Sequence, residues 1–137
     1  MILESLFILP DTKSLRLPSL IANKAFLKKL IDTDEGSHYL GEAALVPFDS
    51  PVSNTNMVYF KTILDENAAC HLAFGEAIST TFLKDVHGLN DKELDKKGIN
   101  TSSIHIDFMI GCKDLNIVAT TRSGKKVTIF KNGNWAK

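Results

Sequence analysis

Large apolar residues occupy every second position from Ile104 to Ile110, and this spacing constrains the fold more than any other segment. Between them stand His105, Asp107 and Met109. A period of two is the spacing of a β-strand, in which successive side chains point to opposite faces. The segment therefore predicts a strand with His105 and Asp107 on one face, about 7 Å apart. Such a pair can hold a metal ion, although it is more commonly the hydrated side of a strand.

Turn and breaker residues divide the rest of the chain into short elements. The predicted strands cover residues 2–9, 40–46, 57–64 and 104–110, with two more, joined by a turn at 122–125, inside 116–130. The predicted helices cover residues from Ser19 to Gly36, 66–74, and 90–98, the last starting with a capping box. One more turn is predicted at 132–134. Together they predict a single domain over residues 1–137 with an α+β (mixed α/β) fold, a sheet of about five or more short strands and two or three helices.

Composition and charge exclude several classes of protein. Sixteen Lys and Arg balance 16 Asp and Glu, so the net charge of zero offers no basic surface for a nucleic acid. No apolar run approaches the roughly 18 residues of a membrane-spanning helix, and the apolar start of the chain lacks the features of a signal peptide. Cys70 and Cys112 are too few for a disulfide framework. We therefore expect a cytoplasmic protein whose partners include neither nucleic acid nor membrane.

Ionisable side chains inside otherwise apolar segments indicate a site. Glu42 interrupts the predicted strand 40–46, and His71 lies in the predicted helix 66–74. Burying such groups is costly unless they are paired, hydrogen-bonded or bound to a metal. Glu66 stands five residues before His71, about 140° around a helix, so the two converge only if Glu66 lies in the turn before it. Structural interpretations stay open, with Glu66 as a first-turn acid and His71 as a hydrogen-bonded core histidine.

Five segments occur in a fixed order along the chain. They are Tyr39–Pro47, Asp49–Asn54, Leu64–Gly75, His105–Gly111 and Asn132–Trp135. Together they resemble the C-terminal part of the thermophilic-type metallo-aminopeptidases, the aminopeptidase T and aminopeptidase S group. The resemblance covers about residues 26–135, and it implies that the chain is the C-terminal, metal-binding portion of such an enzyme.

The resemblance implies a metal-dependent aminopeptidase that hydrolyses the N-terminal residues of peptides at a pair of divalent ions. The ligands that it implies are Glu42, Glu66, His71, His105 and Asp107. A carboxylate such as Glu42 would bridge the two ions, which would be zinc, cobalt or manganese, and the protein would be a homodimer. Carboxylate oxygens and imidazoles suit these metals, and two ions can clamp a scissile carbonyl and activate a bridging water.

Two features of the resembled family differ in this chain. The family has a further glutamate ligand in a long upstream half, and it often has a tyrosine near the metals where this chain has Ile78. Two functions therefore stay open: a truncated aminopeptidase, and a non-catalytic metal-binding or oligomerisation module that keeps the fold. No catalytic residue is assigned from the sequence.

Overall fold

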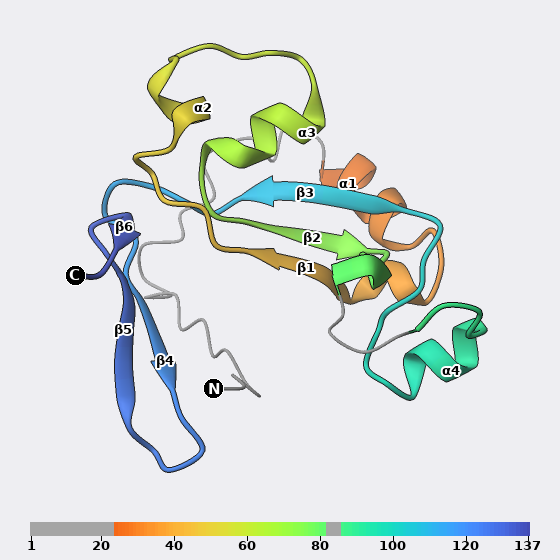
Figure 1. The fold of residues 1–137 in the computed structure, drawn as a ribbon. Helices are drawn as coiled ribbons and strands as arrows, with labels where there is room; N and C mark the ends of the chain where they lie inside the picture. The colour runs from red at the N-terminus through yellow and green to blue at the C-terminus, as the bar shows by residue number, and fades with distance from the viewer. Residues whose placement is uncertain (1–23, 82–85) are drawn as a thin grey trace. The chain divides into compact units, whose positions relative to one another are not determined.

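The computed structural model describes residues 24–81 and 86–137 (Figure 1). Contacts group the chain into two compact units, which are described separately. The described part of the first unit comprises residues 45–70 and 111–137, and that of the second comprises 24–44 and 71–110 without the gap. The strand predicted at residues 2–9 lies outside the described residues, and the single domain stays a prediction.

The second unit is built on an antiparallel sheet in the order β1-β2-β3 (Figure 1). Its strands are β1 Leu40–Ala44, β2 His71–Gly75 and β3 His105–Met109. The central strand, β2, buries every second residue, His71, Ala73 and Gly75. The strands predicted at 40–46 and 104–110 are thereby confirmed as β1 and β3.

The helix predicted at residues 66–74 is wrong. Residues Glu66–Ala68 form only a 3-10 turn, η3, and the backbone is extended at Ala69 before β2 begins at His71. An alanine-rich run favours a helix by intrinsic propensity. Here the hydrogen bonds to β1 on one edge and β3 on the other outweigh that preference.

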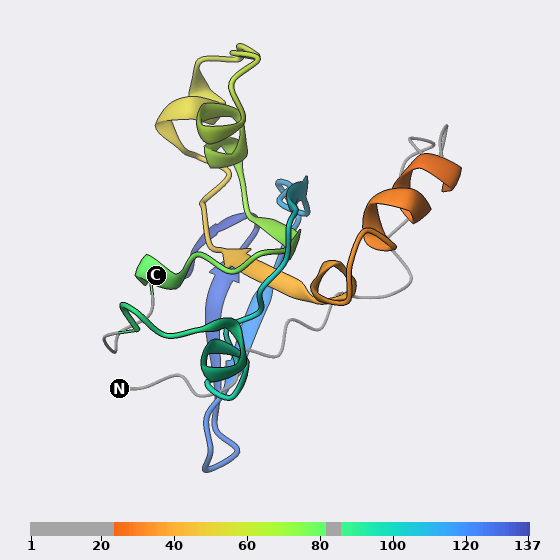
Figure 2. The same cartoon turned by 90° about the vertical axis from the view of Figure 1, so that its right-hand side faces the viewer.

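Short helices precede and connect the strands of the second unit. They are α1 Lys24–Ile31, η2 Gly36–His38, η4 Ser79–Thr81 and α4 Asp91–Asp95. The helix predicted from Ser19 is confirmed over α1, which reaches away from the sheet (Figure 2), and residues 19–23 lie outside the described residues. The predicted capping box is confirmed at α4, where the Asn90 side chain accepts from the backbone N–H of Glu93 and the Glu93 carboxylate accepts from that of Asn90.

The first unit contains a second antiparallel sheet, in the order β4-β5-β6. Its strands are β4 Ile117–Thr120, β5 Lys126–Lys131 and β6 Asn134–Trp135. The buried side chains of Ile117 and Phe130 form its core, and the ring of Phe130 lies 4.4 Å from that of Trp135 between centroids. The strand pair predicted within 116–130 and the turn at 132–134 are confirmed, the latter with left-handed backbone at Asn132 and Gly133.

Two short helices complete the first unit, α2 Pro51–Asn54 and α3 Thr62–Asp65. α2 and the turn formed by α3 and η3 lie side by side (Figures 1 and 2). Ser50 joins them, because its hydroxyl accepts from the backbone N–H of Ser53 at the start of α2 and donates to the carbonyl of Asn67 in η3.

The strand predicted at residues 57–64 is also wrong. The segment has a left-handed residue at Phe60 (φ 55°) and then enters α3. The Asp65 carboxylate accepts from the backbone N–H groups of Tyr59 and Lys61, at 2.8 and 3.0 Å, which folds the segment back on itself. An apolar segment forms a strand only where a partner strand hydrogen-bonds to its backbone. None of the described strands pairs with residues 57–64.

The prediction of one sheet with about five or more strands is not confirmed, because the six strands of the described residues form two sheets of three. The mixture of helices and strands agrees with the predicted fold class. Within residues 24–81 and 86–137, no helix combines the length and the apolar character needed to cross a bilayer.

Candidate metal centre

One face of the β1-β2-β3 sheet carries four of the five predicted ligands. In an antiparallel sheet, residues directly opposite each other point to the same face. Glu42 of β1 and Asp107 of β3 both lie opposite Ala73 of the central strand. His71 is two residues before Ala73 and shares its face, and His105 shares it through its pairing with Gly75.

The side chains of this face approach one another closely. Nε2 of His71 lies 3.2 Å from Oε1 of Glu42, and Nε2 of His105 lies 3.4 Å from Oε2 of Glu42. The same His105 nitrogen lies 3.3 Å from Oδ1 of Asp107. Glu42 therefore stands between the two imidazoles and presents one oxygen to each.

Burial makes this cluster expensive without a ligand. The side chain of His71 is 3% exposed and that of Asp107 is 10% exposed. Among the described residues, Oδ1 of Asp107 is buried and lacks a hydrogen bond, and Nε2 of His105 lies 3.3 Å from it. A buried carboxylate oxygen without a donor costs free energy unless a cation satisfies it.

Three of these residues could meet at one ion. Glu42, His71 and Asp107 each offer a ligand atom, and the three atoms lie within 4.8 Å of one another. Two carboxylates and an imidazole form a donor set typical of zinc, cobalt and manganese. The residues present therefore fit a divalent ion.

The ring of His105 has a defined orientation. Its Nδ1 lies 2.7 Å from the carbonyl oxygen of Glu76 and donates to it, because a carbonyl can only accept. In the neutral ring, Nε2 then carries the lone pair and faces the carboxylates of Glu42 and Asp107. Burial lowers the pKa of His105. The Glu76 carbonyl, Asp107 and Glu42 raise it by more than burial lowers it, so the pKa of His105 lies above its usual value.

The fifth predicted ligand, Glu66, lies in η3 and belongs to the first unit. It occupies a turn that precedes the element of His71, as the sequence spacing requires, although that element is a strand and not a helix. Its part in a site with Glu42, His71, His105 and Asp107 stays a prediction.

Sequence reasoning missed Glu76, whose backbone carbonyl holds the His105 ring. A backbone acceptor has no side-chain signature, so the residue type at position 76 carried no signal. The nearest signal in the sequence was Gly75, a helix-breaking residue that ends the predicted segment 66–74. It has left-handed backbone (φ 96°), and a side chain there would meet the Ile104 carbonyl, so only glycine fits.

The known proteins that this chain resembles identify its family. Residues 21–135 match the family described as thermophilic metalloprotease (M29). The chain belongs to the M29 family. This confirms the family predicted from the sequence, and membership implies divalent metal ions.

Relatives of this M29 chain include three aminopeptidases. Aminopeptidase 2 of Geobacillus stearothermophilus and aminopeptidase AmpS of Bacillus subtilis (strain 168) are each 53% identical over 110 residues, which is 80% of this chain and 26% and 27% of theirs. Aminopeptidase T of Thermus aquaticus is 42% identical over 110 residues, again 80% of this chain and 26% of its own. The M29 chain thus spans about a quarter of the length of these curated relatives.

The fold of this M29 chain is similar to that of a solved relative, wild-type AmpT from Thermus thermophilus. The TM-score is 0.70 at 37% sequence identity, over 85% of this chain and 28% of AmpT. The mixture of helices and strands is therefore a fold of this family.

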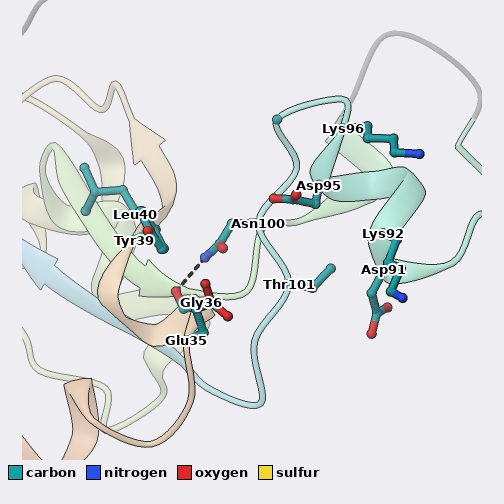
Figure 3. Close-up of a pocket in the computed structure, with 11 residues that line it drawn as sticks. Glu35, Gly36, Tyr39, Leu40, Asp91, Lys92, Asp95, Lys96, Asn100 and Thr101 are labelled. Atoms are coloured by element: carbon teal, nitrogen blue, oxygen red, sulfur yellow. Dashed lines mark hydrogen bonds between the residues drawn. The ribbon is translucent and has the colours of Figure 1, made fainter.

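A shallow pocket of about 880 Å³ lies elsewhere in the second unit of the M29 chain (Figure 3). It lies between the segment that leads into β1 and the region around α4. Its lining includes Glu35, Tyr39, Asp91, Asp95 and Asn100. Glu42, His71, His105 and Asp107 do not line it, so this pocket adds nothing to the metal centre.

Proposed function

We propose that this chain carries a metal centre of an M29 aminopeptidase, with Glu42, Glu66, His71, His105 and Asp107 as ligands of divalent ions. One observation carries the proposal: three neighbouring strands bring Glu42, His71 and Asp107 within 4.8 Å, and Asp107 contributes a buried oxygen without a hydrogen bond. The relatives reported above are named aminopeptidases, which favours a peptide with a free N-terminus as substrate.

The place of Glu42 supports a site with two ions. Its Oε1 faces His71 and its Oε2 faces His105, so one carboxylate could bridge an ion on each side. Such ions, whether zinc, cobalt or manganese, would polarise the scissile carbonyl and lower the pKa of a bound water. The protein's own task is to hold the ligand side chains together and to keep the Nε2 lone pair of His105 directed at the site.

The proposal extends to assembly and location. A homodimer is what the resemblance implies, and a cytoplasmic location is the expectation drawn above from composition. Because the chain spans about a quarter of its relatives, the activity of the whole enzyme requires a test on this chain itself.

Metal content and turnover test the proposal together. Purified chain is incubated with zinc or cobalt, freed of excess metal by size exclusion, and analysed for metal per chain; release of an N-terminal residue from a chromogenic amide is then measured. We expect bound metal that a chelator removes and that a His105→Ala, Asp107→Ala double variant lacks. A matched control is His38→Ala, which removes an exposed histidine of the same unit.

Each result has a defined meaning. Metal with chelator-sensitive turnover supports the aminopeptidase. Metal without turnover supports the alternative, a non-catalytic metal-binding or oligomerisation module. Wild-type chain that holds no more metal than the double variant contradicts the metal centre altogether.

A further inference from the structure

The carbonyl that orients His105 belongs to a residue whose backbone is held from several directions. The N–H of Glu76 donates to the Ile104 carbonyl at 2.6 Å, and its side-chain carboxylate accepts from the backbone N–H of Ser102. The carbonyl of Glu76 itself accepts from Nδ1 of His105. Residues 102–105 and Glu76 therefore hold each other at the end of β2, where it pairs with the start of β3.

Asn100 holds the backbone on both sides of Glu76. Its side-chain amide donates to the carbonyl of Gly75 at 2.6 Å, and its backbone carbonyl accepts from the N–H of Ala77 at 2.9 Å. The second amide hydrogen donates to the carbonyl of Gly36 at 2.7 Å, drawn as the dashed line in Figure 3. One partly buried side chain thus ties the end of β2 to the turn that precedes β1.

The space around these carbonyls leaves little freedom. A Cβ placed on Gly41 would lie 2.2 Å from the carbonyl oxygen of Glu76 and 2.3 Å from that of Gly75. The two carbonyls therefore lie directly against the backbone of β1, next to Glu42. A shift of the Glu76 carbonyl toward β1 would meet the backbone at Gly41, and a shift away from the His105 ring would lengthen its bond to Nδ1.

We propose that Asn100 is a positioning residue of the metal centre. Its side-chain amide fixes the carbonyl of Gly75 directly before Glu76, and so holds the Glu76 carbonyl that keeps His105 as the Nδ1–H tautomer with Nε2 directed at Glu42 and Asp107. Hydrogen-bonded partners of a metal-binding histidine typically set its tautomer and raise metal affinity. The proposal about metal rests on the function proposed above, whereas the effect on the tautomer does not.

The first measurement therefore needs no metal. Long-range ¹H–¹⁵N NMR correlation of the metal-free chain, at a pH above the pKa of the ring, reports which nitrogen of His105 carries the hydrogen. A His105→Gln variant assigns the signal among the four histidines. We expect the Nδ1–H tautomer in the wild type and a mixture of tautomers in Asn100→Ala.

The second measurement is the zinc affinity of the same proteins. We expect Asn100→Ala to weaken zinc binding, by less than the roughly 10- to 100-fold that loss of the histidine's own hydrogen-bonded partner typically costs, because the Glu76 carbonyl stays in the chain. The matched control, Asn90→Ala, removes an asparagine of the same unit whose hydrogen bonds cap α4 and do not reach His105. Asn90→Ala should lose stability but keep the His105 tautomer and the zinc affinity.

A milder variant covers the case in which Asn100→Ala does not fold. Glu76→Ala removes only the acceptor for the Ser102 N–H, and Glu76→Gln restores an acceptor oxygen. We expect Glu76→Ala to shift the tautomer in the same direction, by less, and Glu76→Gln to restore it.

The outcomes separate the two proposals. A tautomer shift in Asn100→Ala, in a wild-type chain that binds no zinc, leaves the positioning role in place and contradicts the metal centre. Zinc binding by the wild type, with tautomer and affinity unchanged in Asn100→Ala, overturns the positioning role. An equal loss of affinity in Asn90→Ala also overturns it, because the effect would then follow stability alone.

Discussion

Asp34 and Asp107 belong to the same compact unit, yet their carboxylates have opposite surroundings. Oδ1 of Asp34 accepts from the N–H of Ser37 and the hydroxyl of Ser102, both at 2.8 Å. Its Oδ2 accepts from the N–H and the hydroxyl of Ser103, at 2.7 and 2.6 Å. Asp107 is only partly exposed and lies among other acceptors, and its buried Oδ1 has no hydrogen bond within the described part of the chain.

The difference separates a carboxylate that builds the fold from one that is available to a ligand. Four donors from two chain segments saturate Asp34, so it ties the turn after α1 to the segment that leads into β3. Asp107 shares its face with Glu42 and two imidazoles, and acceptors are in excess there. An excess of buried acceptors is unfavourable until a cation arrives, which is how residues can be retained for binding at a cost in stability.

The largest expected effect comes from Asp107→Asn. We expect zinc affinity to fall more than about 100-fold, since the loss of an outer-shell partner alone typically costs 10- to 100-fold. The metal-free variant should melt at the wild-type temperature or above, because a neutral amide replaces a carboxylate whose buried Oδ1 has no hydrogen bond. Calorimetric zinc titration and thermal unfolding measure both.

The control for that pair of measurements is Asp95→Asn, which neutralises an exposed carboxylate at the end of α4. It should leave zinc affinity unchanged. If metal-free Asp107→Asn unfolded well below the wild type, Asp107 would be a structural residue like Asp34, and the contrast between them would disappear.

Asp34→Ala should show the reverse pattern. The variant removes the acceptors of four hydrogen bonds, so we expect a lower melting temperature in the absence of metal. Its effect on zinc affinity should be far smaller than that of Asp107→Asn, since Asp34 contributes no atom to the cluster. A loss of zinc binding as large as in Asp107→Asn would show that the two carboxylates are not functionally distinct.

The hydrogen bonds to the Asp34 carboxylate should also make the stability of the fold depend on pH in acid. Hydrogen bonds from the Ser103 hydroxyl and N–H, and then from Ser102, hold the pKa of Asp34 well below its usual value. A carboxyl whose pKa is depressed in the folded state stabilises the fold at pH values above its unfolded pKa, near 4, and loses that contribution as the pH falls further. Urea unfolding of wild type and Asp34→Asn from neutral to acid pH should therefore converge as the pH drops below about 4. A constant difference between them at all pH values would refute this.

The sequence predicted the cluster better than the elements that carry it. Period two placed His105 and Asp107 on one face of a strand, and the cost of burial singled out Glu42 and His71; the structure brings these four together. It could not place Glu66 with them, because that requires the arrangement of two units. It also could not find Glu76 and Asn100, which act through backbone carbonyls and amide hydrogens.

Two elements were predicted wrongly for one physical reason. Both 57–64 and 66–74 are apolar runs without a clear period, and such runs adopt the structure that their neighbours allow. Residues 71–75 pair with β1 on one edge and β3 on the other, and so form the strand β2. The segment 57–64 pairs with none of the described strands and follows instead the local hydrogen bonds of Asp65. Pairing partners far along the chain decide these cases, and a local pattern does not contain them.

The smallest expected effect is that of replacing Phe60 on the free energy of unfolding. It extends the comparison of residues that do and do not stabilise the fold to an apolar side chain. Phe60 is 91% exposed and has left-handed backbone at φ 55°. We expect Phe60→Ser to change the free energy of unfolding by no more than about 0.5 kcal/mol, because an exposed ring contributes little burial. Phe60→Gly should be more stable than Phe60→Ser, since only glycine adopts this backbone without a steric penalty. Urea unfolding of the three proteins measures both differences. A loss of several times that size in Phe60→Ser would mean that the ring is buried in solution. The segment 57–64 would then contribute to the stability of the fold, as Asp34 does.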